Sequence, residues 1–354
     1  MKIAVDVRVV TSGSTKLTGV GKYVQGLWDN LRDASTPGVS FVSSGSQELN
    51  PGSSSVLKLR KFPFLPWQQT SLPAYLSSHS YRVFHGPAFS LPRWGCFKKV
   101  VTIHDLGFSR YPQHVDDRVR TYLKAIVPMA IAQADAIIVP SSLIAKEIIE
   151  DFGEANKNKI FVIPLANSFA KTRQIGNSDK SIILHVGTLE PRKNLGVLLK
   201  AFDYGVETGI FPYKLVLVGG RGWKAEELDL IIENMRHRDR VVTTGYVDDQ
   251  ELEKIYNSAK LYVQPSLYEG FGIPSFDAYV RGIPIVAVKS GWLCDWEIDS
   301  QISMIGDPND PAELADKMAI QLQWAGLTDR KAPMARGWKD VAMDHYALYQ
   351  KVGG

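Results

Sequence analysis

The stretch Tyr268-Glu269-Gly270-Phe271-Gly272-Ile273-Pro274-Ser275-Phe276-Asp277 decides the fold of the second half of this chain. An apolar run at 261–263 comes before it and indicates a short buried strand that ends in a polar turn. Helix-forming spacing follows at 276–281 and ends at Gly282 and Pro284, before a further strand at 285–288. Strand, glycine loop and helix in this order are typical of one repeat of a parallel α/β sheet.

The glycine loop has the chemistry of an anion site. Gly270 and Gly272 lack side chains, so their backbone N–H groups can approach a ligand closely. Because the loop leads into a helix N-terminus, the helix dipole also favours an anion there. Glu269 and Asp277 add carboxylates that accept hydrogen bonds from hydroxyl groups. The loop therefore suits a phosphorylated, hydroxyl-rich ligand, and the alternative is an ordinary strand–turn–helix with glycine in the turn.

The same alternation of strand and helix runs through the whole chain. Strands are predicted at 2–7, 39–42, 100–103, 136–139 and 160–163, and then at 181–186, 214–218, 240–244, 261–263 and 285–288. In the first half, one helix is predicted to end near 32 and another to span 116–134. In the second half, helices are predicted to end near 204 and near 236, a further one to begin at Asp248, and a last one to span 336–349. This order predicts two doubly wound parallel sheets, joined by a polar linker at 171–180.

Composition and cysteine content limit the class of protein. The 354 residues are enough for two domains, and 45% hydrophobic with 22% charged residues is ordinary for a globular protein. No apolar run approaches the roughly 20 residues of a membrane span, and the opening MKIAVDVRVV indicates a strand and not a signal peptide. Cys96 and Cys294 lack metal-ligand spacing, which is typical of a reducing compartment, so we expect a cytoplasmic protein.

The charge is divided unequally. Residues 1–170 carry a net charge of +7 and the remainder −3. Basic residues lie beside aromatic ones at 58–67 and 93–99, a composition that an anionic membrane surface or a pyrophosphate-bearing lipid attracts. The alternative is a set of scattered, solvated charges. No basic helix or nucleic-acid module occurs, so nucleic acid is not an expected partner.

Six motifs in this order carry a specific resemblance: TGVGKY, VVTIHDLGF, GTLEPRKNL, LVLVGGRGW, GYVDDQEL and PSLYEGFGIPSFDA. The succession resembles family 4 of the retaining, nucleotide-sugar-dependent glycosyltransferases with the GT-B fold, and most of all its mannosyltransferase-like branch that builds bacterial surface polysaccharides. The resemblance implies two Rossmann-like domains that face each other across a cleft. The first, 1–170, would take the acceptor, the second, 171–335, would bind the nucleotide sugar, and a helix at 336–354 would cross back to the first.

The resemblance also assigns roles to individual residues. Glu269 would contact the donor sugar near the reacting carbon, Lys193 would neutralise the departing diphosphate, and His104 would orient a sugar hydroxyl. Asp277 would bind the ribose, and Val247 would line the base pocket. Further donor contacts would come from Arg192 and from the backbone of Gly19, Gly21, Gly270, Phe271, Gly272 and Ile273.

The chain departs from the family pattern at three places. The second acid of the pattern is Asp277 where the family has Glu, and Thr188 stands where the family has Arg. Arg192, beside Lys193, is our candidate for the missing cation. The segment 290–297, SGWLCDWE, is atypical of the family.

The expected reaction follows from the resemblance. A hexose, mannose from GDP-mannose in the first place and a UDP-sugar in the second, would pass to a hydroxyl of a saccharide or lipid-linked saccharide. No second carboxylate is firmly placed near the reacting carbon, which favours a front-face displacement over the double displacement of retaining glycosidases. No Asp-x-Asp motif occurs, so neither metal nor other cofactor is expected. Peripheral contact with the inner face of the membrane would suit a lipid-linked acceptor.

Other interpretations stay open at this point. A sugar-nucleotide epimerase or hydrolase would use the same fold, and a degenerate member would bind nucleotide sugar or glycan without transfer. His104 has the alternative of a buried structural histidine, and for His85 core or loop packing is the preferred interpretation over chemistry. Arg221 and Trp223 are interpreted as loop structure, and the apolar stripe that begins at Trp338 as core packing.

Overall fold

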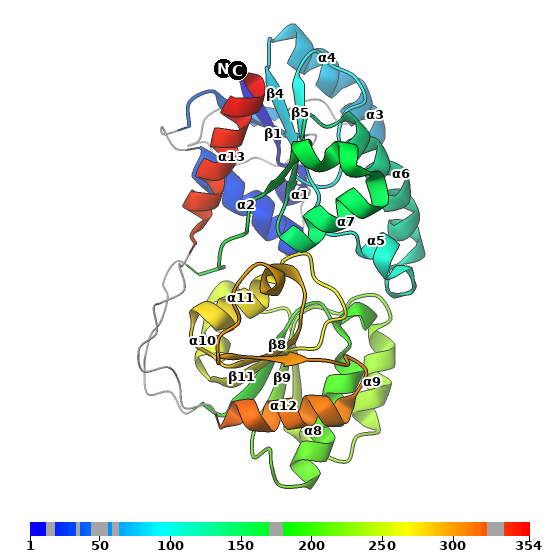
Figure 1. Ribbon diagram of the computed structural model, residues 1–354, viewed down its shortest axis with the longest axis vertical. Coiled ribbons are helices and arrows are strands. Elements are labelled where there is room, and N and C mark those ends of the chain that lie inside the picture. The colour runs from blue at the N-terminus through cyan, green and yellow to red at the C-terminus, as the bar shows by residue number, and fades with distance from the viewer. Residues whose placement is uncertain (12–17, 33–35, 44–55, 59–63, 170–179, 324–335) are drawn as a thin grey trace. The chain divides into compact units, whose positions relative to one another are not determined.

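The computed structural model describes residues 1–11, 18–32, 36–43, 56–58, 64–169, 180–323 and 336–354. These residues form two compact units, shown as ribbons in Figure 1. The first unit comprises 1–106, 118–166 and 336–354, and the second comprises 107–117 and 167–335. The expected boundary at 170/171 thus falls four residues after the observed one, and 107–117, which we assigned to the first domain, belongs to the second unit. Most of the predicted linker, 171–179, lies outside the described residues.

The first unit is built on a parallel sheet of seven strands in the order β3-β2-β1-β4-β5-β6-β7. The strands are β1 (Ile3–Asp6), β2 (Val39–Ser43), β3 (Val56–Lys58), β4 (Val83–Gly86), β5 (Lys98–Thr102), β6 (Ala136–Val139) and β7 (Ile160–Val162). Val5 on β1 is opposite Phe41 on β2 and His85 on β4. All residues of β1, β4 and β6 are buried, as apolar strands of a parallel sheet covered on both faces should be.

Helices of the first unit come from both ends of the chain. They are α1 (Arg8–Thr11), α2 (Gly19–Leu31), α3 (Phe64–Gln69), α4 (Ser71–Ser78), α6 (Asp117–Gln133), α7 (Ser142–Phe152), the 3-10 helix η2 (Glu154–Lys159) and α13 (Trp338–Gly353). The last helix, α13, lies beside α2 and packs on β4 and β5 (Figure 1). Trp338 of α13 contacts the ring of Tyr23 in α2, with centroids 6.3 Å apart.

The second unit holds a parallel sheet of six strands in the order β10-β9-β8-β11-β12-β13. The strands are β8 (Ile182–Val186), β9 (Lys214–Val218), β10 (Val241–Gly245), β11 (Ala259–Gln264), β12 (Ile285–Val288) and β13 (Ile302–Ile305). The α-helices are α5 (Gly107–Arg110), α8 (Leu195–Glu207), α9 (Ala225–Glu233), α10 (Asp249–Asn257), α11 (Ile273–Val280) and α12 (Pro311–Leu322). Four short 3-10 helices complete it: η1 (Pro112–His114), η3 (Pro191–Lys193), η4 (Arg238–Arg240) and η5 (Gly291–Cys294).

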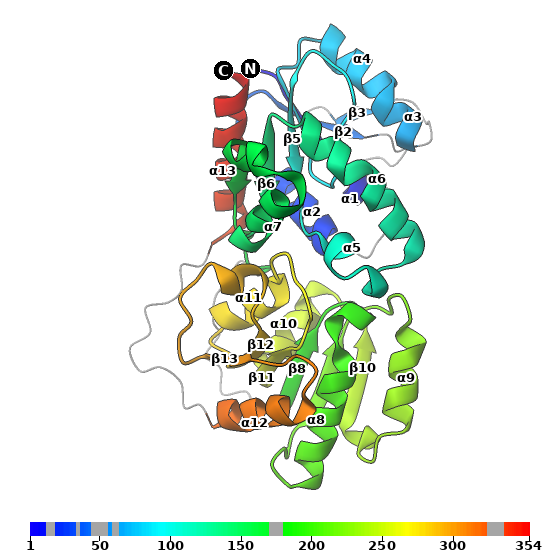
Figure 2. The ribbon, with the colours of Figure 1, turned by 45° about the vertical axis from the view of Figure 1, so that its right-hand side comes forward.

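Helices cover both faces of the sheet in the second unit. Helices α11 and α12 lie on opposite faces of the sheet (Figure 2), and α8 packs beside α12. The core between α8, α12 and the sheet is mostly aliphatic, with Leu198, Leu217, Val263 and Met318 among its buried members. No helix in the described part of the chain is long and apolar enough to cross a bilayer.

Candidate functional site

Loops at the carboxyl ends of β8, β9 and β11 meet at one edge of the second sheet. The loop after β8 is tied to the loop after β9 by a hydrogen bond from Leu189 N to Gly220 O, 2.9 Å. It is tied to the loop after β11 by a bond from Leu267 N to Arg192 O, 3.0 Å. In a parallel α/β sheet this edge is where ligands bind. The sequence motifs GTLEPRKNL, LVLVGGRGW and PSLYEGFGIPSFDA therefore converge at one place.

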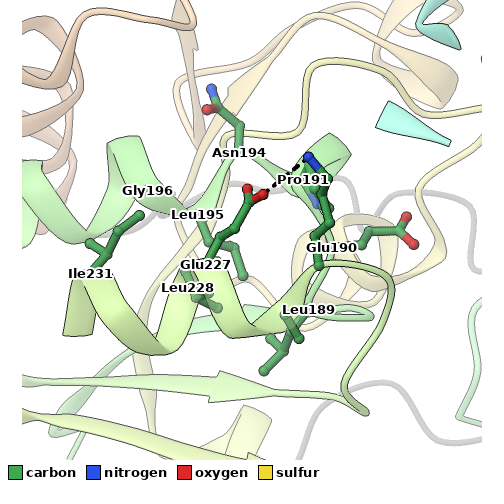
Figure 3. Close-up of a pocket in the computed structure, with 11 residues that line it drawn as sticks. Leu189, Glu190, Pro191, Asn194, Leu195, Gly196, Glu227, Leu228 and Ile231 are labelled. Carbon is green, nitrogen blue, oxygen red and sulfur yellow. Dashed lines mark ion pairs between the residues drawn. The ribbon is translucent and has the colours of Figure 1, made fainter. Parts of the chain in front are cut away.

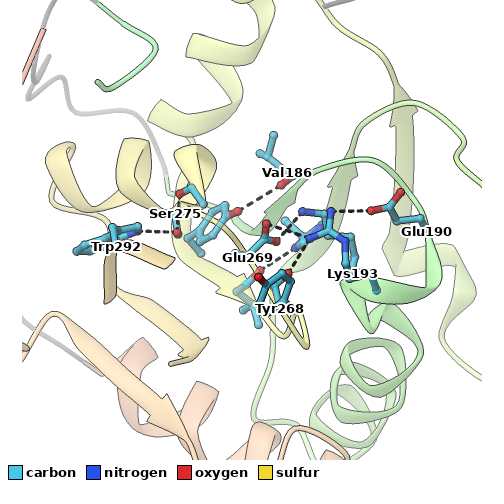
Figure 4. A network of polar contacts seen from close by, with 12 residues as sticks. Val186, Glu190, Lys193, Tyr268, Glu269, Ser275 and Trp292 are labelled. Carbon is cyan, nitrogen blue, oxygen red and sulfur yellow. Dashed lines mark hydrogen bonds and ion pairs between the residues drawn. The ribbon is translucent and has the colours of Figure 1, made fainter. Parts of the chain in front are cut away.

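An ion-pair cluster occupies the centre of these loops (Figure 4). Lys193 Nζ lies 2.6 Å from Glu269 Oε1, and Arg192 Nη1 lies 3.4 Å from Glu269 Oε2. Arg192 also donates to the carbonyl of Tyr268 at 2.6 Å and pairs with Glu190 at 2.8 Å. The structure thus brings together three of the predicted site residues, Glu269, Lys193 and Arg192. Arg192 reaches the acid of the glycine loop, although Thr188 stands at the position of the family's cation.

Burial makes this cluster electrostatically unusual. Glu269 is 7% exposed and Lys193 is 8% exposed. Burial alone would raise the pKa of Glu269, but the Lys193 and Arg192 cations outweigh it and lower that pKa to about 2. Glu269 is therefore a carboxylate at neutral pH, which can accept hydrogen bonds but cannot donate a proton. Lys193 has three N–H groups, and its bond to Glu269 uses one of them.

The glycine loop leads directly into helix α11. Gly272 is the N-cap and has φ +90°, a conformation that favours glycine, so the chain turns there without strain. Ser275 Oγ donates to Gly272 O at 2.9 Å and holds the turn against the helix. The first turn of α11 therefore directs its N–H groups, including that of Ile273, out of the helix end beside Phe271 and Gly270.

The segment 290–297, which is atypical of the family, holds this loop in place through hydrogen bonds. The backbone N–H of Trp292 donates to Phe271 O at 3.0 Å, and its indole Nε1 donates to Ser275 Oγ at 2.9 Å (Figure 4). Gly291 has φ +59°, and a Cβ there would lie 2.1 Å from Phe271 O. This role was not predicted from the sequence, and the signal that could have indicated it is the glycine followed by the buried Trp292 shortly after β12.

Asp277, the predicted ribose ligand, lies on α11 behind the loop. Its side chain is 3% exposed, and Oδ1 accepts a hydrogen bond from the backbone N–H of Ser168 at 2.6 Å. Arg281, one turn further along, stacks on Phe169 at 4.4 Å. Asp277 and Arg281 together hold the chain where the second unit begins. Ribose binding by Asp277 stays a prediction.

The remaining predicted residues of the second unit lie in the surrounding loops. Val247 is half-buried in the turn between β10 and α10. Arg221 is exposed and pairs with Asp229, which agrees with its interpretation as loop structure. Within the described ranges, no group of three or more His, Cys, Asp or Glu side chains could hold a metal ion.

A cavity of about 150 Å³ lies beside this site (Figure 3). Its wall is mostly aliphatic, from Leu189, Leu195, Leu228 and Ile231, and an ion pair of 3.0 Å joins Lys224 to Glu227 in it. Lys193 and Glu269 do not line it. We therefore assign the chemistry to the ion-pair cluster and not to this cavity.

Three predicted site residues, Gly19, Gly21 and His104, lie in the first unit. Gly19 opens α2, and the N–H of Gly21 bonds to the capping hydroxyl of Thr18 at 3.4 Å. His104 follows β5, is 8% exposed, and its Nε2 lies 2.7 Å from the carbonyl of Pro87. Because a carbonyl only accepts, Nε2 carries a proton. Burial lowers the pKa of His104, so the ring is neutral at neutral pH.

A chain of hydrogen bonds joins buried residues of four elements in the first unit. Its members, in order, are Tyr349, His85, Thr102, Tyr23, His345 and Val341. The five successive contacts measure 2.6, 2.8, 2.8, 2.7 and 2.7 Å. The carbonyl of Val341 can only accept, so His345 Nδ1 donates to it and His345 Nε2 accepts from Tyr23. Tyr23, Thr102 and His85 then each donate once and accept once, and the hydroxyl of Tyr349 donates to His85 Nδ1 at the end of the chain. The interpretation of His85 as a core residue is confirmed, since it is 0% exposed.

Comparison with known proteins gives two family models that match consecutive parts of the chain. "Glycosyltransferase Family 4" matches residues 17–166, and "Glycosyl transferases group 1" matches residues 168–330. The chain belongs to glycosyltransferase family 4. The glycosyltransferase has the two-domain α/β architecture of the GT-B fold, as the motifs predicted.

Individual relatives agree with the family. The glycosyltransferase is 29% identical to O-antigen chain mannosyltransferase B of Escherichia coli in an alignment of 338 positions that covers 87% of each chain. Among solved structures it is similar to sucrose-phosphate synthase from Thermosynechococcus elongatus, with a TM-score of 0.70 and 21% identity over 99% and 98% of the two chains. It is also similar to Anabaena Alr3699/HepE in complex with UDP and glucose, with a TM-score of 0.67 and 18% identity over 99% and 97%.

Proposed function

We propose that this glycosyltransferase transfers a hexose from a nucleoside-diphosphate sugar to a hydroxyl of a saccharide or lipid-linked saccharide, with retention at the anomeric carbon. GDP-mannose is the proposed donor, and surface-polysaccharide assembly the proposed setting. The observation that carries the proposal is the buried Glu269–Lys193 pair beside the N-terminus of α11. The mannosyltransferase named among the relatives supports the choice of sugar.

The chemistry follows from the charge states of these groups. Glu269 is ionised, so it would accept hydrogen bonds from the sugar hydroxyls and would not protonate the leaving group. The bond between the anomeric carbon and the phosphate oxygen breaks, and the diphosphate gains negative charge that Lys193 and the N-terminus of α11 would stabilise. The acceptor oxygen forms its bond on the same face, and its proton passes to the departing phosphate oxygen. Positioning and charge stabilisation would supply most of the rate without a metal ion.

A thermal-shift screen tests the donor. GDP-mannose, UDP-glucose, UDP-N-acetylglucosamine, GDP and UDP are compared on the wild type and on Glu269→Ala. Binding to the native state raises the melting temperature with the logarithm of ligand concentration over Kd. We expect a shift from one nucleotide class, and a smaller shift for the sugar nucleotide in Glu269→Ala. No shift from any compound would overturn the donor-site proposal.

Proton NMR of the product with a saccharide acceptor tests the reaction. We expect the anomeric configuration of the donor to be kept and activity to survive a chelator. Inversion would overturn the proposed retention, and complete loss in the chelator would overturn the proposed independence from metal.

Two observations favour a second candidate, a protein that binds nucleotide sugar without transferring it. The carboxylate of Asp277 already holds the backbone of Ser168, and Thr188 supplies no cation. This candidate predicts donor binding by calorimetry with no turnover on any acceptor. A sugar-nucleotide epimerase or hydrolase would differ from both, because it would form product when no acceptor is present.

A further inference from the structure

A buried imidazole that the proposed function does not use lies beside the ion-pair cluster. His185 is on β8, is 1% exposed, and its Nδ1 lies 2.9 Å from the carbonyl of Val263. Because that carbonyl can only accept, Nδ1 carries the proton. Burial lowers the pKa of His185 to about 4, so the ring is neutral at pH 7 and Nε2 keeps its lone pair.

The Nε2 atom of His185 is buried and has no hydrogen-bond partner among the described residues. A buried acceptor left in this state is costly and is uncommon in native proteins. It borders the small space above Gly187, because a Cβ there would lie 3.3 Å from His185 Nε2, 3.2 Å from Lys193 Cε and 3.6 Å from Lys193 Nζ. The absence of a side chain at Gly187 therefore leaves the imidazole and the end of Lys193 facing the same space.

Lys193 can supply the missing donor. Its ammonium has three N–H groups, of which one bonds to Glu269 Oε1 at 2.6 Å. A rotation about the last bonds of the side chain moves the ammonium between the carboxylate and the imidazole without displacing the backbone. A spare donor and an unsatisfied acceptor thus lie on either side of one space.

We propose that His185 is a positioning residue for Lys193, whose ammonium donates a hydrogen bond to His185 Nε2 whenever Glu269 releases it. In the absence of ligand, Glu269 holds the ammonium. When sugar hydroxyls occupy Glu269, a step that rests on the proposed function, His185 keeps the cation at the site. A neutral imidazole orients the ammonium without neutralising it, so the full positive charge stays available for a diphosphate.

The first test needs no ligand, so it is independent of the proposed function. The nitrogen-15 resonance of His185 Nε2 is recorded in histidine-labelled wild type, Glu269→Ala and Glu269→Ala/Lys193→Met. Removal of the carboxylate frees Lys193, so we expect an upfield shift of the Nε2 resonance in Glu269→Ala and its loss in the double variant. An unchanged resonance in folded Glu269→Ala would overturn the proposal.

The second test keeps the proposal falsifiable should Glu269→Ala not fold. Affinities for GDP and UDP are measured by calorimetry in His185→Phe, which removes the acceptor, and in His185→Gln, which keeps one. We expect about a ten-fold loss in His185→Phe, since a hydrogen bond to a charged group is lost, and partial recovery in His185→Gln. Tyr262→Phe is the control, because Tyr262 stacks on His185 but bonds to Val186 O.

The two tests distinguish a failure of the role proposed for His185 from a failure of the proposed function. Wild-type affinity in His185→Phe would overturn the role of His185. Absence of GDP and UDP binding in the wild type would overturn the proposed function, and the resonance in Glu269→Ala would still decide whether His185 receives Lys193.

Discussion

Glu269 and Lys193 show how strongly one buried ion pair depends on both of its members. In Lys193→Met the carboxylate of Glu269 stays buried and keeps the more distant cation, Arg192, at 3.4 Å. Removing one partner of a buried pair leaves a charge without compensation, so we expect the free energy of unfolding to fall by about 3 kcal/mol. Urea denaturation at pH 7 measures this loss. Transfer activity should fall as well, because no cation would remain at the position of Lys193.

A matched control comes from the pair of Lys224 and Glu227, which lies 3.0 Å apart in the same unit but is largely exposed. Exposed pairs contribute little, so Lys224→Met should lower the stability by less than about 1 kcal/mol. The double variant Lys193→Met/Glu269→Gln removes both buried charges and should be more stable than Lys193→Met alone. If Lys193→Met loses no more stability than Lys224→Met, the stabilising role of the buried pair is contradicted.

Single residues at this site were predictable from their motifs, but their pairing was not. Glu269 stood out because an acid beside a glycine loop suits a phosphorylated, hydroxyl-rich ligand, and Lys193 was singled out by the resemblance to the family. The sequence places them 76 residues apart, and only the neighbouring positions of β8 and β11 in the sheet show that they form an ion pair. His185 was missed because its meaning depends on a lone pair without a partner, which no sequence pattern displays.

At the scale of elements, η5 and the glycine loop are in direct contact, so neither can move without the other. A methyl group at Gly291 would meet Phe271 O, so Gly291→Ala must displace either η5 or the loop that leads into α11. We expect a loss of stability of about 1–3 kcal/mol from this clash and a raised KM for the donor. Denaturation and donor-dependent kinetics measure the two effects.

Gly209→Ala separates the clash from backbone strain. Gly209 has φ +74°, close to the +59° of Gly291, but nothing lies within 4 Å of a Cβ there. Its substitution should cost only the conformational strain, about 1 kcal/mol, and should leave the KM unchanged. Equal effects on KM from the two substitutions would contradict the supporting role of η5.

Periodic, apolar elements were predicted well and irregular ones were not. Strands β6, β9 and β12 have the predicted bounds, and α10 begins after Asp248, whose side chain accepts from Glu251 N as expected of a cap. Helices α3 and α4 were missed because each carries a proline and few charged residues, so no amphipathic pattern marks them. Strand β13 was missed because its four residues show no alternation: Ile302 and Ile305 are buried, the two residues between them are half-buried, and only pairing with β12 defines the strand.

At the scale of the whole molecule, the two units should respond differently to acid. The first unit buries three histidines whose pKa values are lowered by desolvation, His85, His104 and His345, the last to about 4. The second unit buries His185, whose pKa is likewise about 4. An unfolded histidine titrates near 6.5, so below this pH the unfolded chain binds more protons than the folded one. Stability therefore falls with falling pH, by up to about 1.4 kcal/mol per pH unit for each such histidine.

Titration of Glu269 does not offset this difference in acid sensitivity between the two units, because the pKa of Glu269 lies below the pH range concerned. Its folded pKa of about 2 lies below the ordinary value of 4.5, so its stabilising contribution is complete above 4.5 and is lost only below that pH. Between pH 6.5 and 4.5 the first unit should thus lose stability faster than the second. Three buried histidines of the first unit would take up a proton, against His185 in the second, and protonation of His85 or His345 would also break the hydrogen bond that its ring accepts.

Hydrogen exchange measured by mass spectrometry at pH 7 and pH 5, corrected for the intrinsic rates, tests this difference. We expect α2, β4 and α13 to lose protection at pH 5 while β8, β11 and α8 keep more of theirs. His345→Gln supplies the control, because an amide does not titrate and should reduce the pH dependence of the first unit alone. Equal losses in the two units would contradict the prediction, and so would a first unit whose protection does not change between the two pH values.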